Sequence, residues 1–196
     1  MKNKLCPILL FFILSFNCLS QKINEIKIGN QIWATDNLNV EKFRNGDIIK
    51  QAKTIDEWMQ ANENEQPAWC YYENKEKNGI KFGKLYNGFA VFDPRVLAPE
   101  GYHIPTDEEW TTLIQFVNEE KSKNKLNELK FNMQYGGFRY DGGNFNGMKE
   151  SGYWWSKTEY FETKNGWFRS VDFKSDSITR DMHGFDWGFY VRCIKD

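Results

Sequence analysis

The sequence predicts a domain of the α+β class, in which helices and strands occupy separate stretches of the chain. Two strongly signalled helix starts lie in its first two thirds, at Thr54 and Thr106. The last third contains short apolar alternations separated by glycine-rich turns, a pattern typical of antiparallel strands. Separate runs of helix and strand favour an α+β arrangement over a parallel α/β sheet. We therefore expect two short helices packed on small antiparallel sheets, with a loop-rich C-terminal half.

The first twenty residues indicate an export signal that does not belong to the folded domain. Two lysines precede the almost unbroken apolar run Leu5–Phe16, which is too short to span a bilayer. Small residues at 18 and 20 suit a signal-peptidase cut, while lipidation at Cys18 is the alternative. We expect a signal at 1–20, a single domain at 21–196, and export to the extracellular space or the cell surface.

The composition excludes some classes of partner. Without the two lysines of the signal, 24 basic residues stand against 27 acidic ones, a net charge of about −3. A nucleic-acid-binding surface needs a basic excess, so no nucleic-acid partner is expected. No later segment is apolar enough for a transmembrane helix. The eight tryptophans suit either a dense core or a contact surface for carbohydrate or protein.

The first third of the chain predicts a hairpin, a turn and a helix. Residues 26–32 alternate around a Gly-Asn turn, as the two strands of a hairpin do. The Asn-Gly-Asp sequence at 45–47 predicts another turn. Thr54 and Glu57 have the spacing of a capping box, in which each side chain accepts from a main-chain N–H at the helix start. A short amphipathic helix containing Trp58 is expected to follow.

The middle of the chain predicts aromatic segments and then the longer helix. Residues 67–72 are extended and aromatic, 73–79 a charged, solvated loop, and 82–92 a buried strand or a short helix. Thr106 and Glu109 form a second capping box, and the apolar residues after it recur with the period of a helix. This helix is expected over 107–120, followed by a surface loop at 121–125.

The last third predicts strands joined by turns. Residues 152–156 form one strand, and 167–173 and 178–182 pair as a hairpin. The chain closes with a strand at 188–194, whose odd-numbered residues are expected on one side because strand side chains alternate.

Seven motifs occur in order along the mature chain: Trp33 with Asn37-Leu38, Trp69–Tyr72, Gly83–Asn87, Leu97–Trp110, Gly136–Arg139, Gly152–Ser156 and Gly188–Cys193. Together they resemble the Fibrobacter succinogenes major paralogous domain, a family of exported bacterial proteins without an established activity. The resemblance covers about 28–196. The proline-threonine helix start and the last strand are also similar to the sulfatase-modifying, or formylglycine-generating, group. The resemblance therefore implies a C-type-lectin-like, sulfatase-modifying-factor-like fold.

Two cysteines remain after the signal, Cys70 and Cys193. A pair of cysteines in an oxidising compartment is usually bridged, and members of the family often carry cysteines at these positions. We therefore expect a disulfide, which the chain-entropy model values at roughly 4–5 kcal/mol for so long a loop. Two buried, unpaired thiols are the alternative.

Few residues suggest catalysis or a metal site. An oxidase of the formylglycine-generating kind needs a reactive thiol, whereas Cys193 lies among apolar residues, where thiols are inert. His103 is expected to be a hydrogen-bonding residue and His183 a surface loop residue, because neither has zinc-ligand spacing. No cofactor or metal is therefore expected. Calcium is a weaker alternative to an ordinary glycine turn at three oxygen-bearing side chains: Asp141, Asn144 and Asn146.

The remaining hypothesis is recognition. The candidate ligand residues are aromatic or arginine side chains of the last third: Arg139, Tyr153, Trp154, Trp167, Arg169 and Trp187. Trp154 and Trp155 point to opposite faces of a strand, so at most one is expected to meet a ligand. We expect an exported, non-catalytic binding module for carbohydrate or protein. The alternatives are an enzyme derived from formylglycine-generating-type relatives and a structural component of an envelope or secreted assembly.

Overall fold

The computed structural model describes residues 23–119, 130–175 and 178–196. The predicted signal at 1–20, the lipidation at Cys18 and the loop at 121–125 lie outside these residues. No helix in the described part is long and apolar enough to cross a membrane. The helices are α1 (Ile55–Glu63), the 3₁₀ helix η1 (Tyr72–Asn74), α2 (Glu76–Phe82), α3 (Gly88–Val91) and α4 (Asp107–Glu119).

The strands form two sheets. The smaller sheet has the order β1 (Glu25–Ile28), β2 (Gln31–Ala34), β13 (Ile194–Lys195) and β6 (Tyr102–His103). The larger sheet has the order β11 (Ile178–Gly184), β10 (Asn165–Asp172), β9 (Ser151–Glu159), β7 (Gly136–Arg139), β12 (Gly188–Phe189), β5 (Leu85–Asn87), β4 (Ala68–Cys70) and β3 (Lys50–Gln51), with β8 (Phe145–Met148) beside β7. The α+β class is confirmed. The larger sheet is more extensive than predicted and is mixed, because β3–β4 and β7–β9 pair in parallel.

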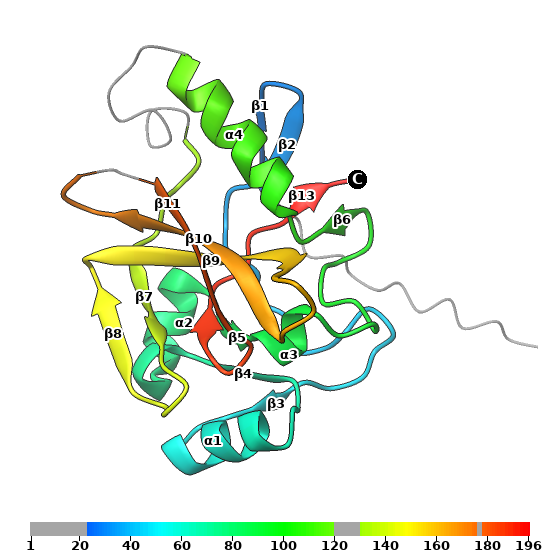
Figure 1. The fold of residues 1–196 in the computed structure, drawn as a ribbon, viewed down its shortest axis with the longest axis vertical. Coiled ribbons are helices and arrows are strands. Elements are labelled where there is room, and N and C mark those ends of the chain that lie inside the picture. The colour runs from blue at the N-terminus through cyan, green and yellow to red at the C-terminus, as the bar shows by residue number, and fades with distance from the viewer. Residues whose placement is uncertain (1–22, 120–129, 176–177) are drawn as a thin grey trace, which may run out of the picture.

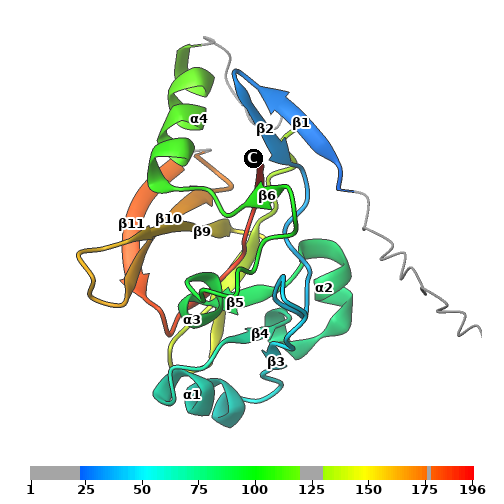
Figure 2. The same cartoon turned by 90° about the vertical axis from the view of Figure 1, so that its right-hand side faces the viewer.

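The helices lie around the sheets. In both views α4 is near one end of the long axis and α1 is at the other (Figures 1 and 2). The β1–β2 hairpin lies against α4: Gln31 Nε2 donates to the Glu109 carbonyl at 3.0 Å. A Cβ built on Gly29, at the hairpin turn, would lie 3.1 Å from the Phe116 ring of α4. The glycine therefore allows the close approach of hairpin and helix.

Both predicted capping boxes form, with one difference. At α4, Thr106 Oγ1 accepts from the Glu109 N–H at 3.2 Å, and Glu109 Oε2 accepts from the Thr106 N–H at 2.8 Å. At α1, Thr54 Oγ1 accepts from the Glu57 N–H at 3.1 Å. The Glu57 carboxylate, however, accepts from the Lys53 N–H at 2.6 Å, one residue earlier than predicted. Both helices begin where the sequence places them.

The predicted solvated loop at 73–79 is wrong, because η1 and α2 occupy this stretch. Asn78 Nδ2 donates to the Tyr72 carbonyl at 2.8 Å, which fixes α2 on η1. A Cβ on Gly79 would lie 2.1 Å from the Tyr71 ring, so the helix packs where only glycine fits. The buried contacts come from an amide and a glycine, neither of which gives an apolar periodicity.

The strand predicted at 188–194 is divided between the two sheets. Residues 188–189 join the larger sheet as β12 and residues 194–195 the smaller one as β13. Between them the chain stays buried and bonds to the segment after β2: the Leu38 N–H donates to the Val191 carbonyl at 2.8 Å. We call residues 189–194 the crossing segment.

The predicted alternation of the crossing segment is confirmed. Its odd-numbered side chains enter one hydrophobic cluster, which contains Trp155 and is here named the Trp155 cluster: Phe189, Val191 and Cys193. Tyr190 and Ile194 enter a second one, the Trp154 cluster. The crossing segment thus contributes side chains to both halves of the core.

The predicted disulfide is not formed. Cys70 and Cys193 are free and buried, the first in the Trp154 cluster and the second in the Trp155 cluster. Burial raises the pKa of the Cys70 thiol to about 11 and that of Cys193 to about 12. The prediction rested on cysteine count and compartment, which carry no information about where the fold places the two side chains.

Candidate functional site

The structure buries three of the six side chains predicted to contact a ligand: Arg139, Trp154 and Arg169. The Arg139 guanidinium donates to three main-chain carbonyls at 2.7–3.1 Å. Trp154 Nε1 donates to Asn37 Oδ1 at 2.8 Å, and Arg169 is ion-paired with Asp107. These three side chains hold the core together, and their prediction as ligand contacts is wrong.

The other three candidates are half-buried: Tyr153, Trp167 and Trp187. His183, which lies on β11 rather than in a loop, stacks on Trp187 with 3.7 Å between ring centroids. The Arg180 guanidinium lies 3.3 Å from the centroid of Trp167. Phe189 stacks on Tyr153 at 5.5 Å. Each ring therefore has a face already covered by the protein, which reduces its value as a platform for a ligand. As expected, Trp154 and Trp155 point into different clusters, but both are fully buried.

The three calcium candidates lie around the turn between β7 and β8: Asp141, Asn144 and Asn146. Asp141 Oδ1 accepts from the Gly142 N–H at 2.7 Å and Asn146 Oδ1 from the Gly147 N–H at 2.8 Å, so each side chain bonds the main chain of the next residue. Within the described ranges, no group of three His, Cys, Asp or Glu side chains is placed to hold a metal ion. Calcium binding by this loop stays a prediction.

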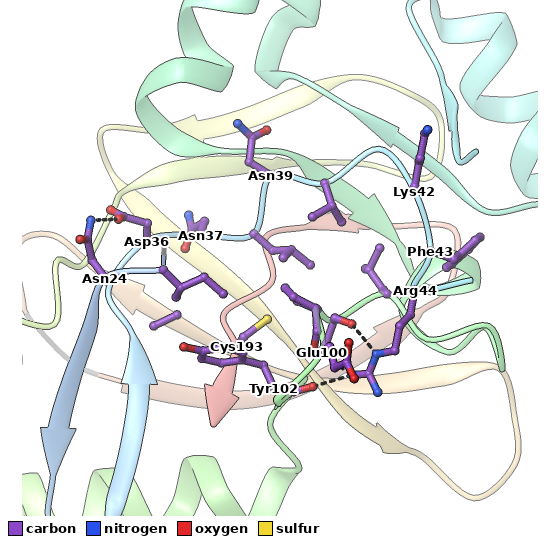
Figure 3. Close-up of a pocket in the computed structure, with 17 residues that line it drawn as sticks. Asn24, Asp36, Asn37, Asn39, Lys42, Phe43, Arg44, Glu100, Tyr102 and Cys193 are labelled. Atoms are coloured by element: carbon purple, nitrogen blue, oxygen red, sulfur yellow. Dashed lines mark hydrogen bonds between the residues drawn. The ribbon is translucent and has the colours of Figure 1, made fainter. Parts of the chain in front are cut away.

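A pocket of about 610 Å³ lies elsewhere, between the segment that leaves β2 and the loop before α4 (Figure 3). Its floor is formed by buried or half-buried apolar residues: Ala34, Leu38, Val40, Phe43, Leu97, Ala98 and Cys193. Its rim carries more exposed polar side chains: Asn24, Asp36, Asn39, Lys42, Arg44, Glu100 and Tyr102. An apolar floor with a few polar groups in a volume of this size suits a small organic ligand.

Arg44 joins the two walls of the pocket. Its main-chain N–H donates to the Val96 carbonyl at 2.9 Å, and its Nε donates to the Ala98 carbonyl at 3.2 Å. Its Nη2 donates to the carbonyls of Pro99 and Tyr102 at 2.9 and 2.8 Å. The loop before α4 presents these carbonyls because most of it lies outside the sheets. The guanidinium is therefore fixed in place (Figure 3).

Other hydrogen bonds set the rest of the rim. The Asp36 carboxylate accepts from the amides of Asn24 and Asn132 at 3.1 and 3.2 Å. The Tyr102 hydroxyl donates to Glu25, and burial together with this carboxylate raises the pKa of Tyr102 to about 12. The phenol is therefore neutral at physiological pH. Arg44, Asp36 and Tyr102 are therefore held by the protein itself before any ligand arrives.

The titratable groups near the pocket do not favour catalysis. Cys193 contributes a thiol to the floor, but its raised pKa keeps it protonated and unreactive at neutral pH. His103 bonds Glu109 at 2.8 Å and Asp196 at 2.7 Å, which confirms its predicted hydrogen-bonding role, and it is not part of the pocket lining. The arrangement suits binding more than bond making.

Sequence reasoning missed this pocket. Its walls were interpreted as the exit from a strand and the approach to a helix, and Lys42 and Arg44 received no role. One signal was available, because Asn37-Leu38 and Leu97–Trp110 are two of the seven motifs and parts of both line the pocket. Neither segment has a helix or strand periodicity that explains its polar residues.

Residues 26–195 match the model of a protein family described as the Fibrobacter succinogenes major domain (Fib_succ_major). Apart from Glu25, the first residue of β1, the matched range contains both sheets, and it contains nearly all of the pocket lining. No curated protein and no solved structure matches the chain.

Proposed function

Because the chain belongs to the Fibrobacter succinogenes major domain family, we propose that it is an exported binding module of the cell surface or extracellular space. The module is non-catalytic and recognises a carbohydrate or a protein segment. The pocket between the segment after β2 and the loop before α4 holds the ligand, and its preformed polar rim is the observation that carries the proposal. The C-type-lectin-like fold belongs to the same proposal, supported by the α+β class.

The main alternative is an enzyme derived from formylglycine-generating-type relatives. Such an oxidase needs a thiolate or a thiol pair that exchanges disulfides. Here the two thiols are buried in separate clusters, and burial raises both pKa values. This arrangement favours binding over thiol chemistry. A structural role in an envelope or secreted assembly is the third possibility, and it requires no pocket.

A ligand screen by thermal shift tests the proposal. Val40→Trp would put an indole into the pocket, and Ile80→Trp, at a side chain 83% exposed on α2 and outside the lining, is the matched control. A ligand from a glycan and peptide panel should raise the melting temperature of the wild type and of Ile80→Trp, but not of Val40→Trp. If Trp187→Ala abolishes the shift and Val40→Trp keeps it, recognition occurs at the aromatic surface instead.

A further inference from the structure

The strands at the margins of the two sheets differ in length. β11 ends the larger sheet with seven residues, Ile178–Gly184, whereas the other marginal strands, β1, β3, β6 and β8, have two to four. Figure 2 shows β11 along the outer side of this sheet. In the part of the chain that the structure describes, β11 pairs with β10 alone. The main-chain groups on its outer side are therefore available to a further strand.

The pairing with β10 shows which main-chain groups of β11 point outward. Just after the strand, the Phe185 N–H donates to the Lys164 carbonyl at 2.9 Å, in the direction of β10. Because N–H directions alternate along a strand, those of Arg180 and Met182 point away from β10. The Met182 N–H agrees with this alternation, since its acceptor is the neighbouring Asp181 Oδ1, at 2.8 Å. β11 thus has outward donors and acceptors at alternate residues.

β11 lacks several features with which proteins protect an edge strand, namely proline, lysine, a bulge or a very short length. Its sequence contains neither proline nor lysine, and its register with β10 is continuous over seven residues. At the other end of the same sheet, β3 is two residues long and contains Lys50. The charged side chains of β11 are instead one cation and one anion in succession, Arg180 and Asp181. Such a strand can pair with itself in a register that brings no like charges together.

We propose that β11 pairs with β11 of a second copy of this chain, antiparallel and centred on Met182, so that two larger sheets become one. A pairing centred on Arg180 or on Asp181 would place that charge directly opposite its own copy, which is destabilising. Centred on Met182, Asp181 of each copy lies opposite His183 of the other. The two methionines then meet at the twofold axis and add an apolar contact.

His183 is prepared for this contact. Its ring is stacked between Phe168 and Trp187, with centroid distances of 5.5 and 3.7 Å. Within the described ranges, no hydrogen bond is made by its ring nitrogens. When the Met182 N–H donates to a carbonyl of the other copy, the Asp181 carboxylate loses its present donor and can accept from His183 across the axis. The pairing therefore gives both side chains a partner.

Sedimentation velocity of the protein over a concentration series tests the proposal. The mass of the wild type should rise from that of one chain toward that of two. Met182→Lys puts two ammonium groups at the twofold axis and should weaken the association at least about fivefold. Gln51→Lys introduces the same residue on β3, at the other end of the sheet, and should associate as the wild type does. A wild type that stays monomeric, or a dimer that Met182→Lys leaves intact, would overturn the proposal.

Cysteine cross-linking tests the register independently. In Met182→Cys the two thiols are opposite each other, with a Cα separation of about 5.5 Å that suits a disulfide. In Asp181→Cys they are diagonal neighbours about 7–8 Å apart, too far for an unstrained bridge. Under oxidising conditions Met182→Cys should therefore form the covalent dimer faster, and the two native thiols are buried and do not contribute. Equal or faster cross-linking of Asp181→Cys would overturn the pairing centred on Met182.

Discussion

Asn37 connects three parts of the core through one side chain. Its Oδ1 accepts from Trp154 Nε1 at 2.8 Å and from Arg192 Nη2 at 3.0 Å, and its Nδ2 donates to the Phe82 carbonyl at 2.8 Å. An amide is suited to this position because it both donates and accepts. Arg192 is fully buried, and burial lowers its pKa to about 10; its Nε donates to Asn37 Oδ1 at 3.2 Å, so the loss of this oxygen leaves a buried donor unsatisfied.

Asn37→Leu should therefore lower the free energy of unfolding by about 3 kcal/mol, since it leaves buried donors on Trp154 and Arg192 unsatisfied. Asn37→Asp should cost less, because a carboxylate still accepts from both and also offsets the arginine charge. Urea denaturation of the two variants measures the difference. Equal losses for Leu and Asp would contradict this account of the site.

His103 gives the fold a pH dependence. Burial opposes its protonation, but hydrogen bonds to Asp196 and Glu109 outweigh this effect and raise its pKa above the ordinary value of 6.5. A raised pKa means that the folded state holds the proton more tightly than the unfolded chain does. The stabilisation from His103 is therefore complete below pH 6.5 and is lost as the pH rises through the folded pKa.

His103→Gln should remove this loss of melting temperature on the alkaline side of pH 6.5. His183→Gln is the control, because burial lowers the pKa of His183 and its effect on stability has the opposite sign. Melting curves of both variants between pH 5 and 9 distinguish them. An unchanged pH profile in His103→Gln would show that the two carboxylates do not act through this ring.

Among the secondary-structure elements, α4 is fixed at its N-terminus by more than its cap. Asp107, in the first turn, pairs with Arg169, which is buried, and with Arg180, which is exposed. Asp56 occupies the first turn of α1, where no described residue forms an ion pair with it, and it acts there on the helix dipole. The two acids have the same place in their helices but different partners.

Asp107→Asn should destabilise the protein by about 3 kcal/mol, because it leaves the buried Arg169 guanidinium without a counter-charge. Asp56→Asn should cost only a few tenths of a kcal/mol. Thermal or urea unfolding of the pair measures both effects under one condition. Similar costs at the two positions would mean that the ion pair at α4 adds nothing to the dipole effect.

The elements found from sequence are those with local signals. Thr106 and Glu109 define the start of α4 within one turn of chain, and the Gly-Asn turn after Ile28 defines the first hairpin in the same way. Helix α2 was missed because Gly79 packs against Tyr71 and Asn78 bonds to Tyr72, and such contacts leave no apolar periodicity in the sequence. The pocket was missed for the same reason, since Arg44 acquires its role from carbonyls more than fifty residues away.

At the scale of the whole molecule, the arrangement of the core predicts that Cys70 and Cys193 are free thiols and do not form a disulfide. Cys70 and Cys193 lie in different clusters, so both should react as free thiols on denaturation without reductant. In the folded protein at neutral pH both should react slowly with Ellman's reagent, because burial raises their pKa values. An intact mass 2 Da below that of the reduced chain would demonstrate a disulfide instead.

The crossing segment also affects when the hydrophobic core can form. Residues 189–194 supply side chains to both clusters, and they follow in the chain nearly all the residues that they pack against. Neither half of the core is complete before these residues have been made, so both clusters should close late in folding. In the export proposed above, this dependence would keep the chain unfolded until the crossing segment has been made.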